Sequence, residues 1–334
     1  MLVRARAPLR ISFAGGGTDI REYYERFGGA VVNATIGLYC YTTLKPRSDR
    51  KLVIRESLYG VNEEAELDAK DGLNTFFGSV VRRFNPLSGF ELYVSSDTTY
   101  GSGLGSSSTA IVSVVVAFNK WLSLNLDLYD LAELAYQIER LDMRIKGGKQ
   151  DQYAAVFGGF NFIEFYRDKV IVNSMRLSDD VVKELQFRCV LVRVDRPRVS
   201  GDVIGEQLRL MDEAERLEHY AQLKRLASEI KNRLYVGKVD EIPALVSEEW
   251  EHKKALSPSI SNKEVEKAFK LALHYGVQGG KLLGAGGGGY ILFLVGENRD
   301  GFIKGMRKEG YETLTVQFVE RGAEAWEVGK YNRS

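Results

Sequence analysis

The segment Tyr100-Gly-Ser-Gly-Leu-Gly-Ser-Ser-Ser-Thr109 runs directly into the apolar stretch Ala110-Ile-Val-Ser-Val-Val-Val-Ala-Phe118. This pattern predicts a buried helix that begins in a loop of three glycines and five hydroxyl residues. The first turn of a helix leaves backbone N–H groups without partners and carries a partial positive charge, so phosphate is the expected ligand. The loop has no lysine and matches neither G-x-x-x-x-G-K-S/T nor G-x-G-x-x-G, which predicts a different mode of nucleotide binding.

Length and composition indicate a globular protein with a substantial core. The chain has 334 residues, of which 44% are hydrophobic, and this length predicts one large or two medium domains. The character of the sequence changes near Leu185, which predicts a domain boundary there, with domains at 1–185 and 186–334. The 46 basic and 45 acidic residues give a net charge of +1, so neither a nucleic acid nor a membrane surface is an expected partner.

The start of the chain and the cysteines bear on where the protein works. Met1-Leu-Val-Arg-Ala-Arg6 has no apolar signal-peptide core, and no apolar run approaches the length of a membrane span. We therefore expect a cytoplasmic protein. Cys40 and Cys189 lie in apolar, strand-like surroundings, which predicts buried free thiols rather than a disulfide or a metal pair.

The hydrophobic pattern predicts a mixture of strands and helices. Strands are expected at 2–14, 30–44, 51–54, 90–94, 156–165, 169–173, 187–194, 290–295 and 311–319. Helices are expected at 20–27, 73–84, 128–145, 202–245 and 265–275. Thr18 and Asp19 precede the first of these helices as possible cap residues, and the helix at 202–245 is expected to break near Gly237.

A second glycine run lies near the end of the chain. Five of the six residues from 284 to 289 are glycine, and Gly279-Gly-Lys-Leu-Leu283 directly precedes this run. Such a run costs conformational entropy on folding, and a tight turn needs only one or two glycines. The run therefore predicts that the backbone comes close to a ligand or to another loop.

Asp151 lies in the segment Gly147-Gly-Lys-Gln-Asp-Gln-Tyr-Ala-Ala-Val-Phe-Gly-Gly159, between a predicted helix and a predicted strand. A carboxylate there can accept or orient the proton of a substrate hydroxyl, or it can simply cap the next turn. Lys149, two residues away, can hold Asp151 ionised or contact a phosphate. Glu139 lies upstream on a predicted helix and has no basic residue three or four positions away to pair with it.

Arg10 and Asp19 flank the glycine turn at 15–17 in the segment Ala7-Pro-Leu-Arg-Ile-Ser-Phe-Ala-Gly-Gly-Gly-Thr-Asp19. An arginine inside an apolar strand needs a partner. A structural salt bridge, a charged substrate group and Asp151 are the alternatives. The three histidines, His219, His252 and His274, have no metal-ligand spacing and lie near no nucleophile motif, so we expect surface residues and no zinc site or Ser-His-Asp set.

Taken in chain order as the first to the fourth motif, the segments 7–19, 101–109, 147–159 and 279–289 together resemble the GHMP kinase superfamily over nearly the whole chain. The loop at 101–108 is similar to that family's ATP-phosphate motif, and 284–289 is similar to its C-terminal glycine motif. The resemblance implies an α+β fold of two domains, the first like the second domain of ribosomal protein S5 and the second ferredoxin-like. It also implies an active site between these domains and the use of ATP and Mg²⁺.

More specific details resemble the D-glycero-D-manno-heptose 7-phosphate kinases and the L-fucose kinase domains. They are the segment from Arg10 to Asp19, Gly148-Lys-Gln-Asp-Gln-Tyr-Ala-Ala155 with Gly158-Gly-Phe-Asn161, Leu256-Ser-Pro-Ser-Ile-Ser-Asn262, and the context of Gly279 to Leu283. The implied reaction is phosphorylation of the anomeric C1 hydroxyl of a sugar by ATP. Heptose 7-phosphate is the first expected substrate, and an unphosphorylated sugar such as L-fucose is the alternative.

The resemblance also assigns roles to single residues. Asp151 matches the catalytic aspartate, Arg10 the residue that stabilises the transferring phosphoryl group, and Asp19 the aspartate that binds sugar hydroxyls. Glu139 matches the acidic Mg²⁺ ligand and Ser107 the loop serine near Mg²⁺, with Ser106 and Ser108 as rivals. The residues implied to hold ATP are Gly101, Ser102, Gly103, Leu104, Gly105, Ser106, Ser107, Ser108, Gly286 and Gly287.

Two departures from relatives concern the substrate. Gly16 and Gly17 stand where galactokinases carry Glu-His, which leaves room for a larger substrate than galactose. Asp195-Arg-Pro-Arg-Val-Ser-Gly201 is more basic than is usual in heptose kinases. Arg196 and Arg198 can therefore bind a substrate phosphate, together with Lys149, or can be solvated loop residues.

Two other classes of protein compete with the kinase interpretation. A catalytically silent sensor that binds sugar and ATP is disfavoured by the joint presence of Asp151, Glu139 and Arg10. A dinucleotide oxidoreductase is disfavoured because the loop lacks G-x-G-x-x-G, and because Asp127 introduces a helix rather than ending a second strand. The expected partners are small molecules, and the expected assembly is a monomer or a homodimer.

Overall fold

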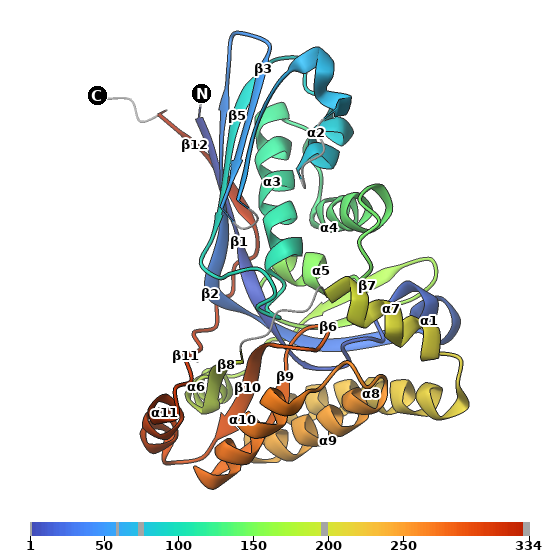
Figure 1. Ribbon diagram of the computed structural model, residues 1–334, viewed down its shortest axis with the longest axis vertical. Helices are drawn as coiled ribbons and strands as arrows, with labels where there is room; N and C mark the ends of the chain where they lie inside the picture. The colour runs from blue at the N-terminus through green and yellow to red at the C-terminus, as the bar shows by residue number, and fades with distance from the viewer. Residues whose placement is uncertain (1, 58–59, 73–76, 195–199, 330–334) are drawn as a thin grey trace.

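The computed structural model describes residues 2–57, 60–72, 77–194 and 200–329 (Figure 1). In this part of the chain an eight-stranded sheet forms the N-terminal half, with the main order β12-β1-β2-β5-β3-β4 and with β6 and β7 added beside β2. Strands β3 and β5 run parallel, and the other described pairs run antiparallel. The strands are β1 (Leu2–Ala14), β2 (Gly29–Pro46), β3 (Lys51–Glu56), β4 (Val61–Glu66), β5 (Phe90–Ser96), β6 (Phe160–Phe165), β7 (Val170–Ser174) and β12 (Glu324–Val328).

Helices cover one face of this sheet (Figure 1). The central one, α3 (Ser106–Leu122), is the helix predicted after the glycine-serine loop, and its side chains from Thr109 to Phe118 are buried against β1 and β2. The other elements are α1 (Arg21–Phe27), the 3₁₀ turn Leu67–Gly72, α2 (Gly78–Phe84), α4 (Leu128–Gln137), a π-helical turn at Ile138–Asp142 and α5 (Gln150–Phe157). The loop that opens α3 and the start of α5 thereby reach the same end of the layer.

The second sheet has four described strands in the order β11-β8-β10-β9. This antiparallel order, with helices after the first and third strands, is the ferredoxin-like arrangement, as the sequence led us to expect. The strands are β8 (Cys189–Val194), β9 (Val277–Leu282), β10 (Gly289–Val295) and β11 (Thr313–Thr315). The helices are α6 (Asp179–Arg188), α7 (Ser200–Leu210), α8 (Ala214–Tyr235), α9 (Ile242–Ala255), α10 (Lys263–His274) and α11 (Arg299–Lys308), with a 3₁₀ turn at Val239–Glu241.

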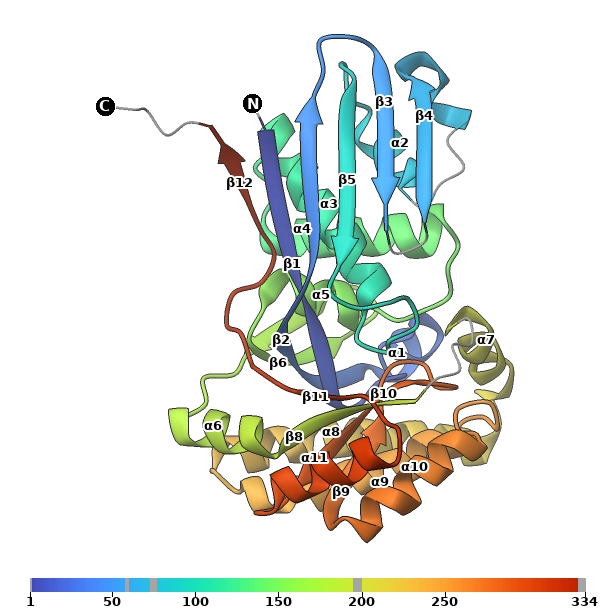
Figure 2. The same ribbon diagram turned by 60° about the vertical axis from the view of Figure 1, so that its left-hand side comes forward.

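The two halves share one packed interior. Helix α8 lies against β1 and β2, and its buried residues Ala227 and Ile230 belong to the same apolar cluster as the first sheet. The last strand, β12, returns to the first sheet and pairs antiparallel with β1, so both ends of the described chain lie on that sheet (Figure 2). The boundary near Leu185 stays a prediction.

The structure corrects several expected elements. The helix expected at 128–145 leaves α-helical geometry after Gln137, where the π-helical turn follows. Residues 156–157 end α5 rather than begin a strand, because Gly158 and Gly159 both adopt positive φ and stop the helix. Residues 187–188, expected to begin a strand, are instead the last residues of α6. Of the helix expected at 73–84, residues 73–76 lie outside the described residues.

Both cysteines are free and buried, as predicted. Burial raises the pKa of Cys40 to about 12 and also raises the pKa of Cys189. Neither thiol is therefore ionised near neutral pH, and a structural role suits both.

Candidate active site

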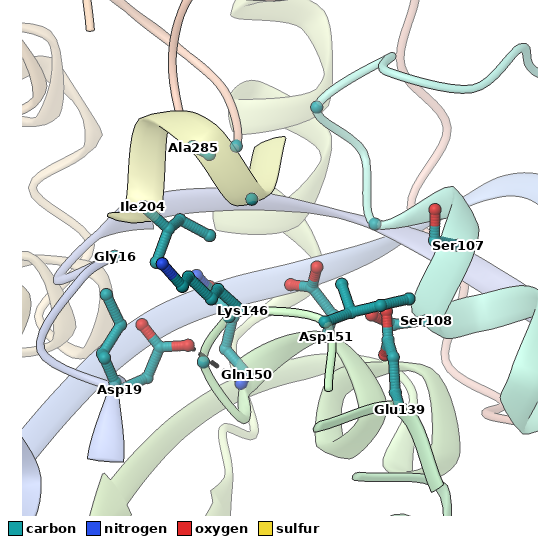
Figure 3. Close-up of a pocket in the computed structure, with 18 of the residues that line it drawn as sticks. Gly16, Asp19, Ser107, Ser108, Glu139, Lys146, Gln150, Asp151, Ile204 and Ala285 are labelled. Carbon is teal, nitrogen blue, oxygen red and sulfur yellow. Dashed lines mark hydrogen bonds between the residues drawn. The ribbon is translucent and has the colours of Figure 1, made fainter. Parts of the chain in front are cut away.

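A cavity of about 510 Å³ lies where the helical layer of the N-terminal half meets the second half of the chain. Residues of all four sequence motifs line it, together with residues of α7 and α9. Figure 3 shows Gly16, Asp19 and Ile204 on one side of this cavity, with Ser107, Ser108 and Glu139 on the other and Asp151 between them. The volume suits a small-molecule site.

The start of α3 forms one wall of the cavity. Its N-cap residue is Gly105, with φ of +81°, and no side chain caps the helix. The backbone N–H groups of the first turn are thus left for a ligand, and the helix dipole favours an anion there. A side chain at Gly105 would lie 3.2 Å from the Asp151 carboxylate, so this glycine allows Asp151 to approach the loop.

The second glycine run packs against the first loop, which confirms the predicted close approach. A Cβ at Gly284 would lie 2.8 Å from Gly103 Cα, and a Cβ at Gly289 would lie 2.7 Å from Ser102 O. Gly286 and Gly287 instead face Ile260, whose carbonyl accepts a hydrogen bond from Gly287 N at 2.9 Å. The parts of this run that line the cavity are Gly284 and Ala285.

Arg10 and Asp151 form a short ion pair in the cavity. Arg10 donates from Nε and Nη2 to Asp151 Oδ1, at 2.7 and 2.6 Å, and from Nη1 to Gly103 O at 2.7 Å. The Arg10 side chain is 3% exposed, whereas that of Asp151 is 19% exposed toward the cavity. Of the partners considered for Arg10, the structure shows Asp151, and the pair is tied to the glycine-serine loop.

Asp19 lies on the other side of the cavity and does not cap α1, contrary to the expectation. Its two oxygens accept hydrogen bonds from Gly17 N at 2.9 Å and from Gln150 N at 3.1 Å. The N-cap of α1 is Ile20, without a side-chain cap. A Cβ at Gly148 would lie 1.8 Å from Asp19 Oδ2, so the glycine before Lys149 is needed to hold this carboxylate.

Glu139 is buried in the π-helical turn and belongs to a polar network. Its Oε2 accepts a hydrogen bond from Gln152 Nε2 at 2.6 Å, and its Oε1 lies 3.1 Å from Arg140 Nη1. Gln152 Nε2 also donates to Ser108 Oγ at 3.2 Å. Sequence reasoning missed Arg140 because it considered partners only three or four positions away. It missed Gln152 although that residue stands next to Asp151 in the third motif.

The three neighbouring serines have different surroundings. Ser106 is buried and shares a 2.6 Å hydrogen bond with Ser102 Oγ. Ser108 joins the network of Glu139, and Ser107 lies on the cavity wall with its hydroxyl turned away from Glu139 (Figure 3). All three serines line the cavity, but Ser106 already shares its hydroxyl with Ser102.

Lys149 turns away from Asp151. Its amine donates to Glu133 Oε2 at 2.9 Å and lies 4.5 Å from the centre of the Tyr136 ring. Position 149 is the N-cap of α5, and the Lys149 side chain is mostly buried, at 12% exposure. Arg196 and Arg198, the other predicted phosphate-binding residues, lie outside the described residues.

The C-terminal half contributes cavity residues that sequence reasoning missed. Lys253 of α9 donates from Nζ to Gly16 O at 3.0 Å and to Gln207 Oε1 of α7 at 3.2 Å. Burial lowers the pKa of Lys253 to about 8, although Glu249 and Asp19 act in the opposite direction. A lysine on a charged amphipathic helix carries no sequence signal that it is buried.

Comparison with known proteins agrees with this geometry. Residues 74–159 match the family model described as GHMP kinases N terminal domain, and residues 210–312 match GHMP kinases C terminal. The chain belongs to the GHMP kinase family. The resemblance inferred from the four motifs is thus confirmed, as are the two-domain α+β fold and the class of ATP-dependent phosphotransferases.

Individual relatives of this GHMP kinase are also informative. The chain is 39% identical over 337 residues to D-glycero-alpha-D-manno-heptose 7-phosphate kinase of Campylobacter jejuni, covering 98% of this chain and 99% of the relative. It is similar to the crystal structure of a D-glycero-D-manno-heptose 1-phosphate kinase from Bacteroides thetaiotaomicron, with a TM-score of 0.79, 32% identity and coverage of 98% and 100%. A putative sugar kinase from Campylobacter jejuni gives a TM-score of 0.77 at 37% identity, with coverage of 97% and 98%. Within the described ranges of this GHMP kinase, no helix is long and apolar enough to cross a membrane.

Replacing Gly148 by alanine is expected to impair use of the phosphoryl acceptor, because the new methyl group must displace Asp19. We expect kcat/KM for the acceptor to fall roughly 10- to 100-fold, as small misplacements at a reacting centre do, with KM for ATP little changed. The matched control is Gly201→Ala, since Gly201 also lines the cavity but a Cβ there meets no atom within 4 Å. Equal losses in the two variants would contradict the role given to Asp19.

Proposed function

We propose that this GHMP kinase transfers the γ-phosphoryl group of ATP to the anomeric C1 hydroxyl of D-glycero-D-manno-heptose 7-phosphate. The observation that carries the proposal is the Arg10–Asp151 pair, which lies between the start of α3 and the side of the cavity that holds Asp19. The 39% identity to a heptose 7-phosphate kinase over nearly the full length supports this choice of acceptor. A cytoplasmic location and a monomeric or homodimeric state stay expectations.

The glycine-serine loop is proposed to bind the phosphates of ATP. The uncapped first turn of α3 offers backbone N–H groups and a positive helix end, and residues 101–108 line the cavity apart from Leu104, which is buried. Gly103 and Gly284 allow the two glycine-rich loops to touch, which fixes the shape of this wall. The loop thus supplies a rigid anion-binding surface before any nucleotide arrives.

Mg²⁺ is the cation that a phosphoryl transfer of this class requires. Magnesium usually binds one or two protein carboxylates and completes its coordination with water and substrate phosphates. No group of three or more His, Cys, Asp or Glu able to hold a metal is found among the described residues. Glu139 and Ser108, which share the donor Gln152 Nε2, fit such a sparse oxygen site, whereas Ser107 would have to turn its hydroxyl toward Glu139. Bound there, Mg²⁺ would neutralise charge on the phosphates.

Asp151 and Arg10 are proposed to carry the chemistry at the acceptor. Asp151 Oδ1 is held by two nitrogens of Arg10, which leaves Oδ2 to accept the proton of the attacking hydroxyl. The positive charge of the Arg10 guanidinium also stabilises negative charge on the transferring group. Anchoring of Arg10 to Gly103 O keeps both groups beside the phosphate-binding loop.

The acceptor is proposed to lie along the side of the cavity formed by the glycine turn. Each carboxylate oxygen of Asp19 accepts one hydrogen bond from a backbone N–H group. The remaining lone pairs can accept hydrogen bonds from sugar hydroxyls. Gly16 and Gly17 line the same side, at the positions where galactokinases carry two larger side chains. The room next to Gly17 is taken by Lys253, whose Nζ lies 2.9 Å from the position of a Cβ on this glycine.

The proposed function is tested by ADP release from Mg-ATP across a panel of acceptors. The panel contains D-glycero-D-manno-heptose 7-phosphate, the corresponding 1-phosphate, the unphosphorylated heptose, D-mannose, L-fucose, D-galactose, mevalonate and homoserine. We expect the highest kcat/KM with the 7-phosphate. Preference for the 1-phosphate would exclude C1 as the acceptor position. Preference for an unphosphorylated sugar would replace the substrate, and ATP binding without any turnover would favour the sensor.

The variant Asp151→Asn is expected to lower kcat by about 100- to 10,000-fold, because the amide cannot accept the hydroxyl proton. The substitution keeps the shape of the side chain, so ATP affinity is expected to stay close to that of the wild type. Steady-state kinetics and equilibrium nucleotide binding measure the two quantities separately. Full activity in this variant would remove Asp151 from the mechanism.

The variant Glu139→Ala is expected to raise the Mg²⁺ concentration needed for half-maximal rate, because it removes the carboxylate of the proposed cation site. The same measurement on Ser107→Ala and Ser108→Ala should show a rise in only one of them, which identifies the serine ligand. An unchanged Mg²⁺ dependence in Glu139→Ala would show that the cation lies elsewhere.

A further inference from the structure

Lys253 is a buried cation that faces the cavity. Its side chain comes from α9, and the whole residue is 5% exposed. Its Nζ donates to two neutral acceptors, Gly16 O and Gln207 Oε1. None of the described Asp and Glu residues forms an ion pair with it.

The two carboxylates that raise the pKa of Lys253, Glu249 and Asp19, accept their hydrogen bonds from other donors, and Glu249 Oε2 accepts none from the described residues. Glu249, one turn earlier on α9, pairs with Lys281 of β9 at 2.6 Å, and this pair is buried. Asp19 accepts two backbone N–H groups. A buried charge without an opposite charge is costly, and the lowered pKa of Lys253 reflects that cost. An anion in the cavity would supply the missing charge.

A second cation, Lys146, lines the same cavity. Lys146 belongs to the loop between the π-helical turn and α5, and its Nζ lies 2.9 Å from the position of a Cβ on Gly205 of α7. Among the described residues it has no hydrogen bond or ion pair. Figure 3 shows this side chain running from the loop toward Ile204, above Asp19. Lys146 and Lys253 therefore approach α7 from two different elements.

We propose that Lys253 and Lys146 bind the phosphate group that the acceptor already carries before the reaction. This inference rests on the proposed function, because it places the anomeric hydroxyl at Asp151. The phosphate at the other end of the acceptor then lies toward the glycine turn. The chain makes room for it there: a Cβ at Gly17 would lie 2.9 Å from Lys253 Nζ, so any larger residue would crowd this amine.

The proposal gives the two lysines a role that Lys149 does not fill, since that residue pairs with Glu133 outside the cavity. It also predicts a preference for a phosphorylated sugar over the unphosphorylated one. A dianionic phosphate gains charge-assisted hydrogen bonds from both amines, whereas a free hydroxyl at the same place leaves the Lys253 charge without a counter-ion.

The test compares Lys253→Met and Lys146→Met with wild type, using heptose 7-phosphate and the unphosphorylated heptose as acceptors. Each variant is expected to lose about 10- to 100-fold in kcat/KM for the 7-phosphate, mainly through KM, and little for the unphosphorylated sugar. The matched control is Lys254→Met. This lysine is the next residue on α9, pairs with Glu251 and does not line the cavity, so both acceptors should be unaffected.

The pH dependence gives a second readout that a purely structural lysine would not move. Burial lowers the pKa of Lys253 to about 8; of the charged groups that act on it, Glu249 and Asp19 raise the pKa and Lys281 lowers it. Below this value the amine is protonated and can bind phosphate; above it the charge is lost. The wild-type preference for the 7-phosphate should therefore fall as pH rises through about 8, and Lys253→Met should lack this step.

Thermal unfolding of each variant serves as the control for correct folding. Replacing an unpaired buried lysine with methionine, which has a similar shape, should not lower stability. If Lys253→Met nevertheless unfolds, Lys146→Met and the wild-type pH profile still decide the question. A wild-type enzyme that uses neither heptose refutes the proposed function. A wild-type preference for the 7-phosphate that survives in Lys146→Met and is flat across pH refutes the phosphate site alone.

Discussion

The Arg10–Asp151 ion pair is the constraint on which the arrangement of the site depends. An arginine in the apolar strand β1 is tolerated only if its charge is compensated. Asp151 supplies that charge from the start of α5, and the carbonyl of Gly103 accepts a further hydrogen bond from the same guanidinium. The backbone of Arg10 also donates to Leu104 O at 3.1 Å. Strand, loop and helix are thereby fixed to one another before substrate binds.

The glycines follow from this constraint. To bring the loop at 101–108 close to Asp151, the chain needs Gly105 without a side chain, and the C-terminal glycine run must then pack against Gly103. The first contact joins two motifs of the N-terminal half, and the second brings the other half of the chain to the cavity. The glycine content of the second and fourth motifs is thus explained by backbone contacts between loops, as well as by the space that a phosphate needs.

Much of this could be predicted from the sequence because the signals are local. The period of the apolar residues predicts β1, whose bounds match the expected 2–14, and the glycine-serine loop predicts the start of α3. The partner of Arg10 was among the alternatives because a buried arginine always needs one. These features depend on few residues close together in the chain or on a single strong physical requirement.

The remaining features depend on tertiary contacts that no local pattern encodes. Glu139 lies in a π-helical turn, and its pairing with adjacent Arg140 breaks the usual helical spacing rule. Lys149 is near Asp151 in sequence, yet the direction of the first turn of α5 sends it to Glu133. Lys253 is buried only because α9 packs beneath the glycine turn. The position of Lys253 in the cavity can therefore be recognised only once the fold is known.

The most direct test of the central claim is a ³¹P NMR spectrum of the product formed from Mg-ATP and D-glycero-D-manno-heptose 7-phosphate. The proposed geometry predicts a sugar bisphosphate with two phosphorus signals, one of them coupled to the anomeric proton, formed in step with ADP. A new phosphate on any carbon other than C1, or ADP accompanied only by inorganic phosphate, would contradict it.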